Sequence, residues 1–407
     1  MTSPVLGPAP TGAGPDPHAM RRTVTALAAD AYAGRRVGTP GGRAAADHLA
    51  DRLRDLGAVV VLDEFAVTGS VREVYATPTL TIRDRDGSRD LMFRREFCEH
   101  LATADVPTPR AGRLARFGDK DVSGAWVLDS GFSAERVASA YAAGAAGVLL
   151  PRGTDGAGWM PKMIAGPAPV GLPVLAVRAD LHEGLATSEA VVSASTPVRP
   201  VDVTGVNVLA TFRAPAPGRL SVLLTAHFDG VGDDPDGVRF PAACDNASGV
   251  AAVLEAARVL HTVLPLEVGL AVALLDAEEA GAYGSAHHAR FVEEGTFVIN
   301  LDGAAQLADA AHVQAGGPSR PLLTALDLAG REVGVPLVAA AMPSDNRRYA
   351  AAGLPAVGIG MGMPGYQTPA ETPDRVDDAT LDRAARLVVG TVANLARSFN
   401  GVRGYAT

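Results

Sequence analysis

The fold is decided by the stretch VGLAVALL, Val268–Leu275, which is followed directly by DAEE, Asp276–Glu279. Every residue of the first stretch is apolar or glycine, without the polar alternation of a half-exposed strand. Such a run predicts a strand that is buried on both faces, as in a mostly parallel sheet covered by helices. The carboxylates that follow are then expected at the carboxyl end of the strand, where open α/β sheets bind their ligands.

The same alternation of apolar strand and helix continues on both sides of this stretch. It predicts an α/β fold with a mostly parallel central sheet covered by helices on both faces. The predicted strands are Val206–Phe212, Leu220–Ala226, Phe297–Leu301 and Ala356–Ile359, and the predicted helices are Ser248–Leu260, Ser285–Phe291, Leu322–Val333 and Ala379–Phe399. Nearer the N-terminus, Met20–Leu56 is expected to be helical with a turn at Ala33–Gly42, and Val59–Val67 is expected to be a strand.

The organisation of the chain suggests an inserted domain. We expect a flexible tail at residues 1–17, a catalytic domain at 18–74 and 201–407, and a smaller, β-rich α/β insert at 75–200. The insert is predicted to contain a βαβ unit. It consists of a strand at Ala125–Asp129, a helix capped by Ser133 and a second strand at Gly147–Leu150. This pattern resembles the protease-associated domain, a module found inserted in peptidases. An ordinary lid or spacer domain is the alternative.

Composition excludes several classes of function. The chain has 407 residues and a net charge of −9, without a basic run, so nucleic acid is not an expected partner. It has no apolar stretch of about 18 residues or more, so we expect no membrane span. The N-terminus lacks the features of a signal peptide, so we expect a cytoplasmic protein. The two cysteines, Cys98 and Cys244, indicate neither a disulfide framework nor a thiolate zinc site.

Polar side chains that can bind metals follow the predicted strands. Several carboxylates that are desolvated together would cost several kcal/mol without compensation, and a divalent cation compensates them. The spacing therefore favours a metal site over a purely structural polar cluster. The residues in question are His227 and Asp229, Asp245, Glu278 and Glu279, Asp302, and Tyr366 and Gln367.

The motifs that contain these residues resemble those of the co-catalytic zinc aminopeptidases. That family includes bacterial leucyl aminopeptidases, glutamate carboxypeptidase, the glutaminyl cyclases and the transferrin receptor. The resemblance covers Val201 to the C-terminus closely and Met20–Phe65 loosely. It is carried, in order, by TAHFD at 225–229, ACDNASGV at 243–250, DAEE at 276–279, NLD at 300–302, SDNRRY at 344–349 and YQTP at 366–369.

The resemblance implies a role for each of these residues. Asp245 would bridge two zinc ions. His227 and Asp302 would complete the coordination of the first ion. Glu279 and the residue that follows Tyr366 would bind the second ion. Asp229 would fix the tautomer of His227. Glu278 would be the general base, and Tyr366 would donate to the developing oxyanion.

One position departs from the family pattern. Gln367 stands where the family has a histidine ligand of the second zinc ion, and an amide oxygen is a weaker zinc ligand than imidazole. The second site is thus expected to be weak, empty or filled by another metal. Cyclase chemistry is not favoured, because the glutaminyl cyclases keep this second site.

Two hypotheses for the function follow from these residues. The first is an aminopeptidase-type exopeptidase that hydrolyses amide bonds of small peptides or related amides, with zinc as cofactor. The alternative is a catalytically lapsed or single-metal relative that binds a partner, serves as a scaffold or acts on a non-peptide amide. No pattern in the sequence predicts the identity of the substrate or the oligomeric state.

Overall fold

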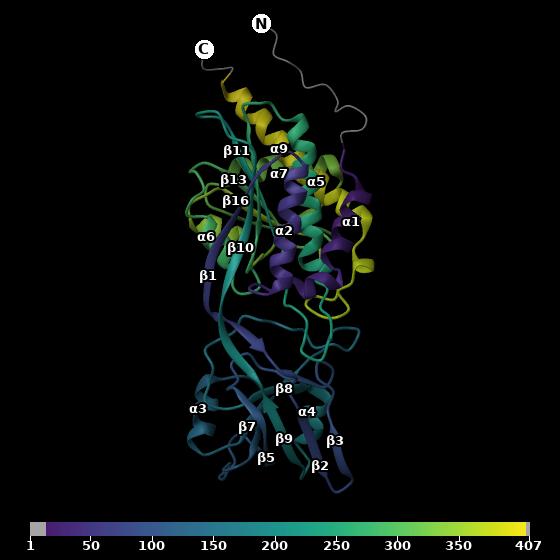
Figure 1. Ribbon diagram of the computed structural model, residues 1–407, viewed down its shortest axis with the longest axis vertical. Coiled ribbons are helices and arrows are strands. Elements are labelled where there is room, and N and C mark those ends of the chain that lie inside the picture. The colour runs from purple at the N-terminus through teal and green to yellow at the C-terminus, as the bar shows by residue number, and fades with distance from the viewer. Residues whose placement is uncertain (1–13, 404–407) are drawn as a thin grey trace.

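The computed structural model describes residues 14–403, and their side chains up to residue 399. Within this part of the chain the strands form two eight-stranded sheets, one in each of two bodies (Figure 1). No helix among the described residues combines the length and apolar character needed to cross a membrane. Residues 1–13 of the expected tail lie outside the described residues, and the first helix begins at Pro17, the last residue of that tail.

The first sheet is parallel at its centre, antiparallel pairs flank this centre on both sides, and the edge pair β14–β15 is again parallel. Its order is β1-β10-β12-β11-β13-β16-β14-β15, and β12, β11, β13 and β16 run parallel to one another. The expected α/β class is confirmed. The strands are β1 Val59–Val74, β10 Val198–Arg213, β11 Ser221–His227, β12 Gly269–Leu275, β13 Phe297–Leu301, β14 Ala311–Gly316, β15 Leu337–Ala339 and β16 Ala356–Gly360.

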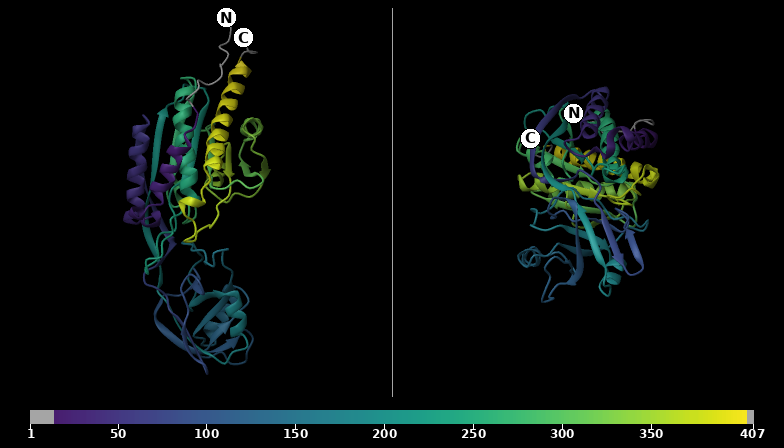
Figure 2. Two further views of the ribbon diagram at one scale, coloured as in Figure 1. Left: turned by 90° about the vertical axis from the view of Figure 1, so that its right-hand side faces the viewer. Right: turned by 60° about the horizontal axis from the view of Figure 1, so that its bottom comes forward.

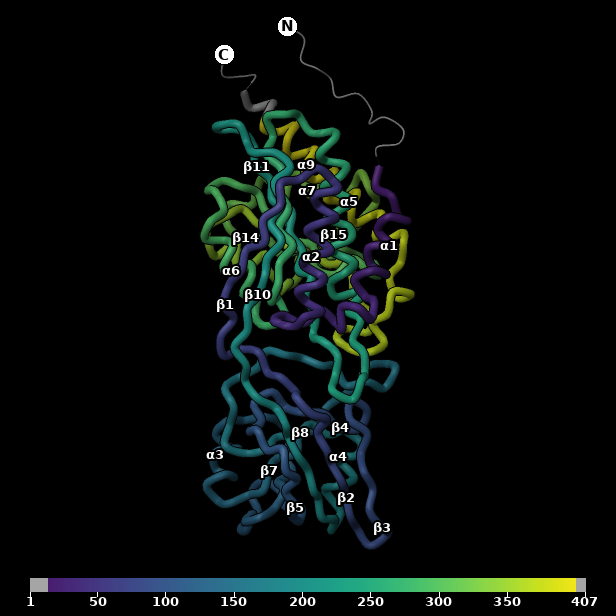
Figure 3. Tube along the Cα trace, viewed as in Figure 1, coloured from purple at the N-terminus to yellow at the C-terminus, as the bar shows by residue number. Residues whose placement is uncertain are grey.

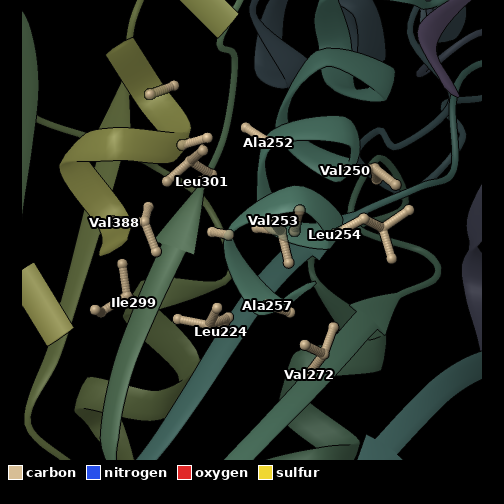
Figure 4. Close-up of a cluster of buried hydrophobic side chains, with 14 of the residues drawn as sticks. Leu224, Val250, Ala252, Val253, Leu254, Ala257, Val272, Ile299, Leu301 and Val388 are labelled. Atoms are coloured by element: carbon tan, nitrogen blue, oxygen red, sulfur yellow. The ribbon is translucent and has the colours of Figure 1, made fainter. Parts of the chain in front are cut away.

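Helices cover both faces of this sheet. One face packs against α5, where Leu224, Val272 and Ile299 of the strands meet Val253 of α5 and Val388 of α9 (Figure 4). The helices of this layer are α1 Pro17–Leu27, α2 Pro40–Asp55, α5 Ser248–Val263, α7 Arg320–Val333 and α9 Asp378–Arg403. The opposite face carries α6, Tyr283–His288, and α8, Asn346–Ala351.

The second body is built by residues between β1 and β10. Its sheet has the order β3-β2-β9-β5-β6-β7-β8-β4, and the predicted βαβ unit is present, with the Ser133 side chain accepting from the backbone N–H of Arg136 at the start of α3. The elements are β2 Leu80–Asp84, β3 Gly87–Asp90, β4 Phe97–Glu99, β5 Val106–Arg116, β6 Trp126–Leu128, α3 Ala134–Ala142, β7 Gly147–Arg152, β8 Val174–Arg178, α4 Ala179–Leu185 and β9 Val191–Thr196.

A long antiparallel ribbon joins the two bodies. Strands β1 and β10 pair from Val59 opposite Thr211 to Val74 opposite Val198, and the ribbon runs from one body into the other (Figure 3). The second body therefore lies at one end of the first, as the side view shows (Figure 2).

A buried ion cluster fixes the second body against the first. The guanidinium of Arg94 donates to both carboxylate oxygens of Asp234, at 2.6 and 3.1 Å, and to Glu99 at 2.9 Å. The ammonium of Lys162 lies 3.0 Å from the same Asp234 carboxylate. Arg94, Glu99 and Lys162 come from the insert, whereas Asp234 lies in the loop that follows β11, so the cluster joins the two bodies close to the end of that strand.

Candidate metal centre

The carboxyl ends of the central strands bring three predicted ligands together. His227 is the last residue of β11, Asp302 directly follows β13, and Asp245 lies in the short helical turn η2, Ala243–Ala247, before α5. One ligand atom from each of the three lies within 4.8 Å of the others, and all three side chains are buried.

The donor set of this cluster fits a zinc ion. His227 Nε2 lies 3.0 Å from Asp245 Oδ1 and 3.2 Å from Asp302 Oδ1. Asp245 Oδ1 is buried and receives no hydrogen bond of proper geometry, which costs about 1–3 kcal/mol or more for a charged group. A divalent cation between these atoms satisfies that oxygen, and imidazole nitrogen and carboxylate oxygen are both zinc ligands.

The imidazole of His227 is set in a strongly negative environment. Burial by itself lowers the pKa of His227, but the charge of Asp302 and contacts with Asp229 and Asp245 outweigh it and raise the pKa well above its usual value. A proton and a divalent cation thus compete for the same nitrogen, because a metal ligand must be a neutral imidazole.

The conformation that presents Asp245 is held by Asn246. Its side-chain oxygen accepts from the N–H groups of Gly249, at 3.0 Å, and Gly303, at 2.9 Å, and its amide donates to the carbonyl of Leu301 at 2.9 Å. These bonds tie the η2 turn to the end of β13 and so bring Asp245 to Asp302. A Cβ on Gly249 would lie 2.2 Å from the Asn246 oxygen, so only glycine fits at that position.

Asp229 lies behind the histidine, where the resemblance places it. Its Oδ1 is 3.4 Å from His227 Nδ1. The same carboxylate accepts from the backbone N–H groups of Glu278, at 3.0 Å, and Glu279, at 3.2 Å. One buried side chain therefore contacts the histidine and also binds the backbone of the glutamate pair after β12.

Replacing Asp229 with asparagine is expected to weaken zinc binding by about 10–100-fold, because outer partners of a ligating histidine fix its tautomer and basicity. The measurement is a zinc dissociation constant obtained by competition with a chromophoric chelator. Asp309→Asn, at an exposed position, is the control and is expected to leave the constant unchanged. Equal affinity in Asp229→Asn and the wild type would rule out this role.

Glu278 and Glu279 are only partly exposed, next to the three buried ligands. Burial raises the pKa of the Glu278 carboxyl well above its usual value, His227 opposes this shift, and Asp302 adds to it. Burial and the neighbouring Asp245 and Glu278 likewise raise the pKa of Glu279. The upward shift moves Glu278 toward the range in which a carboxylate is an efficient general base.

Gln367 contacts Glu279 directly. Its side-chain amide donates to Glu279 Oε2, and its own oxygen is buried without a hydrogen-bond donor. Tyr366 is 45% exposed. Partial desolvation of its hydroxyl, together with Glu279 and Asp245, raises the pKa of Tyr366, so the hydroxyl keeps its proton.

Sequence reasoning missed two residues that support the site. Glu371 accepts from the backbone N–H groups of Cys244, at 3.0 Å, and Asp245 through one oxygen, and from Gln367, at 2.8 Å, through the other. Arg35, in the predicted turn, is fully buried and donates to four backbone carbonyls, those of Leu27, Phe228, Pro241 and Ala242. Burial lowers the pKa of Arg35 to about 10, against the pull of Glu371. Neither residue carried a sequence signal beyond proximity to a motif.

Another buried carboxylate near the cluster, Asp345, lies in a segment that the resemblance did include. It is fully buried, and burial raises its pKa to about 7. Two further histidines, His287 and His288, make contacts outside the cluster: His287 lies 3.2 Å from Asp63, and His288 is hydrogen-bonded to the Tyr349 hydroxyl at 2.8 Å. Cys244 is a buried free thiol.

Comparison with known proteins identifies a peptidase family that part of the chain matches. Residues 207–392 match the family model of peptidase family M28. No curated protein matches the chain by sequence.

Solved structures share the fold over nearly the whole chain. The chain is similar to the zinc aminopeptidase BSAP of Bacillus subtilis, with a TM-score of 0.71, 22% identity, and coverage of 93% of this chain and 94% of that one. An aminopeptidase from Aneurinibacillus sp. strain AM-1 has a TM-score of 0.66 at 22% identity, covering 93% of each chain. A peptidase M28 precursor from Shewanella amazonensis has a TM-score of 0.67 at 18% identity, covering 93% and 96%.

Proposed function

We propose that this chain is an aminopeptidase-type exopeptidase. The proposal is supported by the match of residues 207–392 to the model of peptidase family M28 and by the similarity of the fold to that of a zinc aminopeptidase. The substrates in this proposal are small peptides or related amides with a free amino end. The observation that carries the proposal is the buried contact of His227 Nε2 with Asp245 and Asp302, in which Asp245 Oδ1 has no hydrogen-bond donor.

The side chains around the cluster have distinct tasks in this reaction. Zinc, when bound by His227, Asp245 and Asp302, supplies a water whose pKa is lowered to about 7 and polarises the scissile carbonyl. Glu278 would take a proton from the attacking water and pass it to the leaving amine, acting first as base and then as acid. The hydroxyl of Tyr366 donates to the oxyanion that develops at the carbonyl.

The insert, residues 75–200, enters this proposal as a protease-associated-like domain that stays docked beside the site. The backbone N–H of Lys162 donates to the carbonyl of Gln367 at 2.9 Å, and the hydroxyl of Thr368 donates to Asp155 at 2.8 Å. Together with the buried ion cluster, these contacts hold the loop that carries Tyr366 and Gln367. A domain that served only as a spacer would not need these contacts with the loop that carries Tyr366 and Gln367.

His227→Ala is expected to remove both tightly held zinc and amide hydrolysis, because it deletes the only nitrogen ligand of the described three-residue cluster. Zinc is measured by mass spectrometry of the purified protein, and hydrolysis is measured with a panel of aminoacyl p-nitroanilides and dipeptide amides. His18→Ala, at an exposed position, is the control and is expected to change neither. Zinc retention and full turnover in His227→Ala would contradict the proposal. Wild-type protein that holds zinc yet hydrolyses no member of the panel would favour the binding or scaffold alternative.

A further inference from the structure

We propose that this chain holds a single tightly bound zinc ion, at His227, Asp245 and Asp302, and that the amide of Gln367 replaces a second cation beside Glu279. This inference rests on the proposed function, because it concerns the composition of the same site. It begins from the direct hydrogen bond between the Gln367 amide and Glu279 Oε2.

The chemistry of the two side chains makes a second cation unnecessary at this place. An ionised carboxylate only accepts hydrogen bonds, whereas an amide NH₂ offers two donors. The Gln367 amide therefore pairs with Glu279 directly. If a histidine stood at this position, the lone pair of its imidazole would face the Glu279 carboxylate. The two electron-rich groups would repel each other, and a cation between them would relieve the repulsion.

The opposite orientation of the amide fits zinc poorly. It would place the Gln367 oxygen against the Glu279 carboxylate, which requires a cation to separate the two acceptors. Amide oxygens suit hard cations such as magnesium or calcium better than zinc. The orientation in the structure does leave the Gln367 oxygen buried without a donor. Counting the bound metal ions separates the two arrangements, because only the opposite orientation needs a second cation beside Glu279.

The backbone around Gln367 fixes the position from which its side chain reaches Glu279. Gln367 has a φ of 53°, in the left-handed region that non-glycine residues adopt only when the surroundings impose it. Its N–H donates to Glu371 at 2.8 Å, and its carbonyl accepts from the N–H of Lys162 at 2.9 Å. Because one partner comes from each body, the side chain is delivered to Glu279 from a backbone that is anchored on both sides.

Zinc stoichiometry tests this inference without reference to activity. The full chain is stripped with a chelator, loaded with excess zinc and passed through gel filtration, and the retained metal is counted by mass spectrometry. The wild type is expected to hold one equivalent and Gln367→His two. Glu279→Gln is expected to keep one, since Glu279 is not a ligand of the retained ion. Gln306→His, at an exposed position, is the matched control and is expected to keep one.

Each outcome separates this inference from the proposed function. Two equivalents in the wild type, with one lost in Glu279→Gln, would overturn the single-ion inference and leave the peptidase proposal intact. One equivalent in a folded Gln367→His would show that the amide is not what replaces the second ion. No zinc in the wild type would overturn both. Should Gln367→His fail to fold, the counts for the wild type and Glu279→Gln decide the question.

Discussion

Glu278→Gln is expected to lower the turnover number by about 10²–10⁴-fold while zinc content stays at the wild-type value. Glutamine has the shape of glutamate but cannot accept and return a proton. The effect on zinc is small because Glu278 lies outside the cluster of His227, Asp245 and Asp302. The backbone N–H that binds Asp229 is retained, so the geometry behind His227 is unchanged.

The measurement is a pair of values, the turnover number with the best substrate of the panel and the zinc content of the same preparation. Glu294→Gln, at an exposed position, is the control and is expected to match the wild type in both. Turnover within a few fold of the wild type in Glu278→Gln would remove the general-base role. A parallel loss of zinc would instead make Glu278 part of the metal shell.

Arg94→Met is expected to lower the free energy of unfolding by about 3–5 kcal/mol. Arg94 and Asp234 are fully buried and Glu99 nearly so, and the guanidinium compensates both carboxylates. Burial lowers the pKa of Arg94, but Glu99 and Asp234 outweigh burial and raise it, so the guanidinium stays charged. Removing it leaves two buried carboxylates, of which Asp234 keeps the ammonium of Lys162 at 3.0 Å.

Urea unfolding of the purified chain measures this loss. Arg113→Met is the matched control, because Arg113 pairs with Asp121 at 3.0 Å but both side chains are largely exposed. Exposed pairs contribute about 0–1 kcal/mol, so the control is expected to unfold close to the wild type. A free energy for Arg94→Met within about 1 kcal/mol of that control would show that the cluster does not hold the two bodies together.

Much of the fold followed from local patterns. The buried strands β11, β12, β13 and β16 and the helices α5, α7 and α9 were predicted because continuous apolar runs and helical spacing are local properties. The strand predicted at Val206–Phe212 is longer and begins at Val198. It pairs with β1 along most of its length, but several residues between Arg199 and Thr204 are exposed, so only its second half has the apolar run that predicted a strand. Strands β14 and β15 were not predicted, since both are short and partly exposed.

The site, like the fold, was predicted in part from the sequence. The order of His227, Asp245, Glu278, Glu279, Asp302, Tyr366 and Gln367 along the chain was enough to predict a metal centre, because parallel strands bring their carboxyl ends to one edge of a sheet. The roles assigned to these residues stay proposals. Asp276, which follows the same strand as Glu278, accepts from the N–H of Val206 at 2.9 Å and is structural, a distinction that spacing did not offer.

The sequence by itself determined the α/β architecture and which strands end in metal-binding side chains, because both depend on residues close together in the chain. Only the tertiary structure decided which of those side chains touch. Glu371 reaches Asp245 across 126 positions, Arg94 reaches Asp234 across 140, and the amide of Gln367 meets Glu279 across 88. Such contacts depend on the packing of distant segments, and no local pattern of polarity or spacing encodes them.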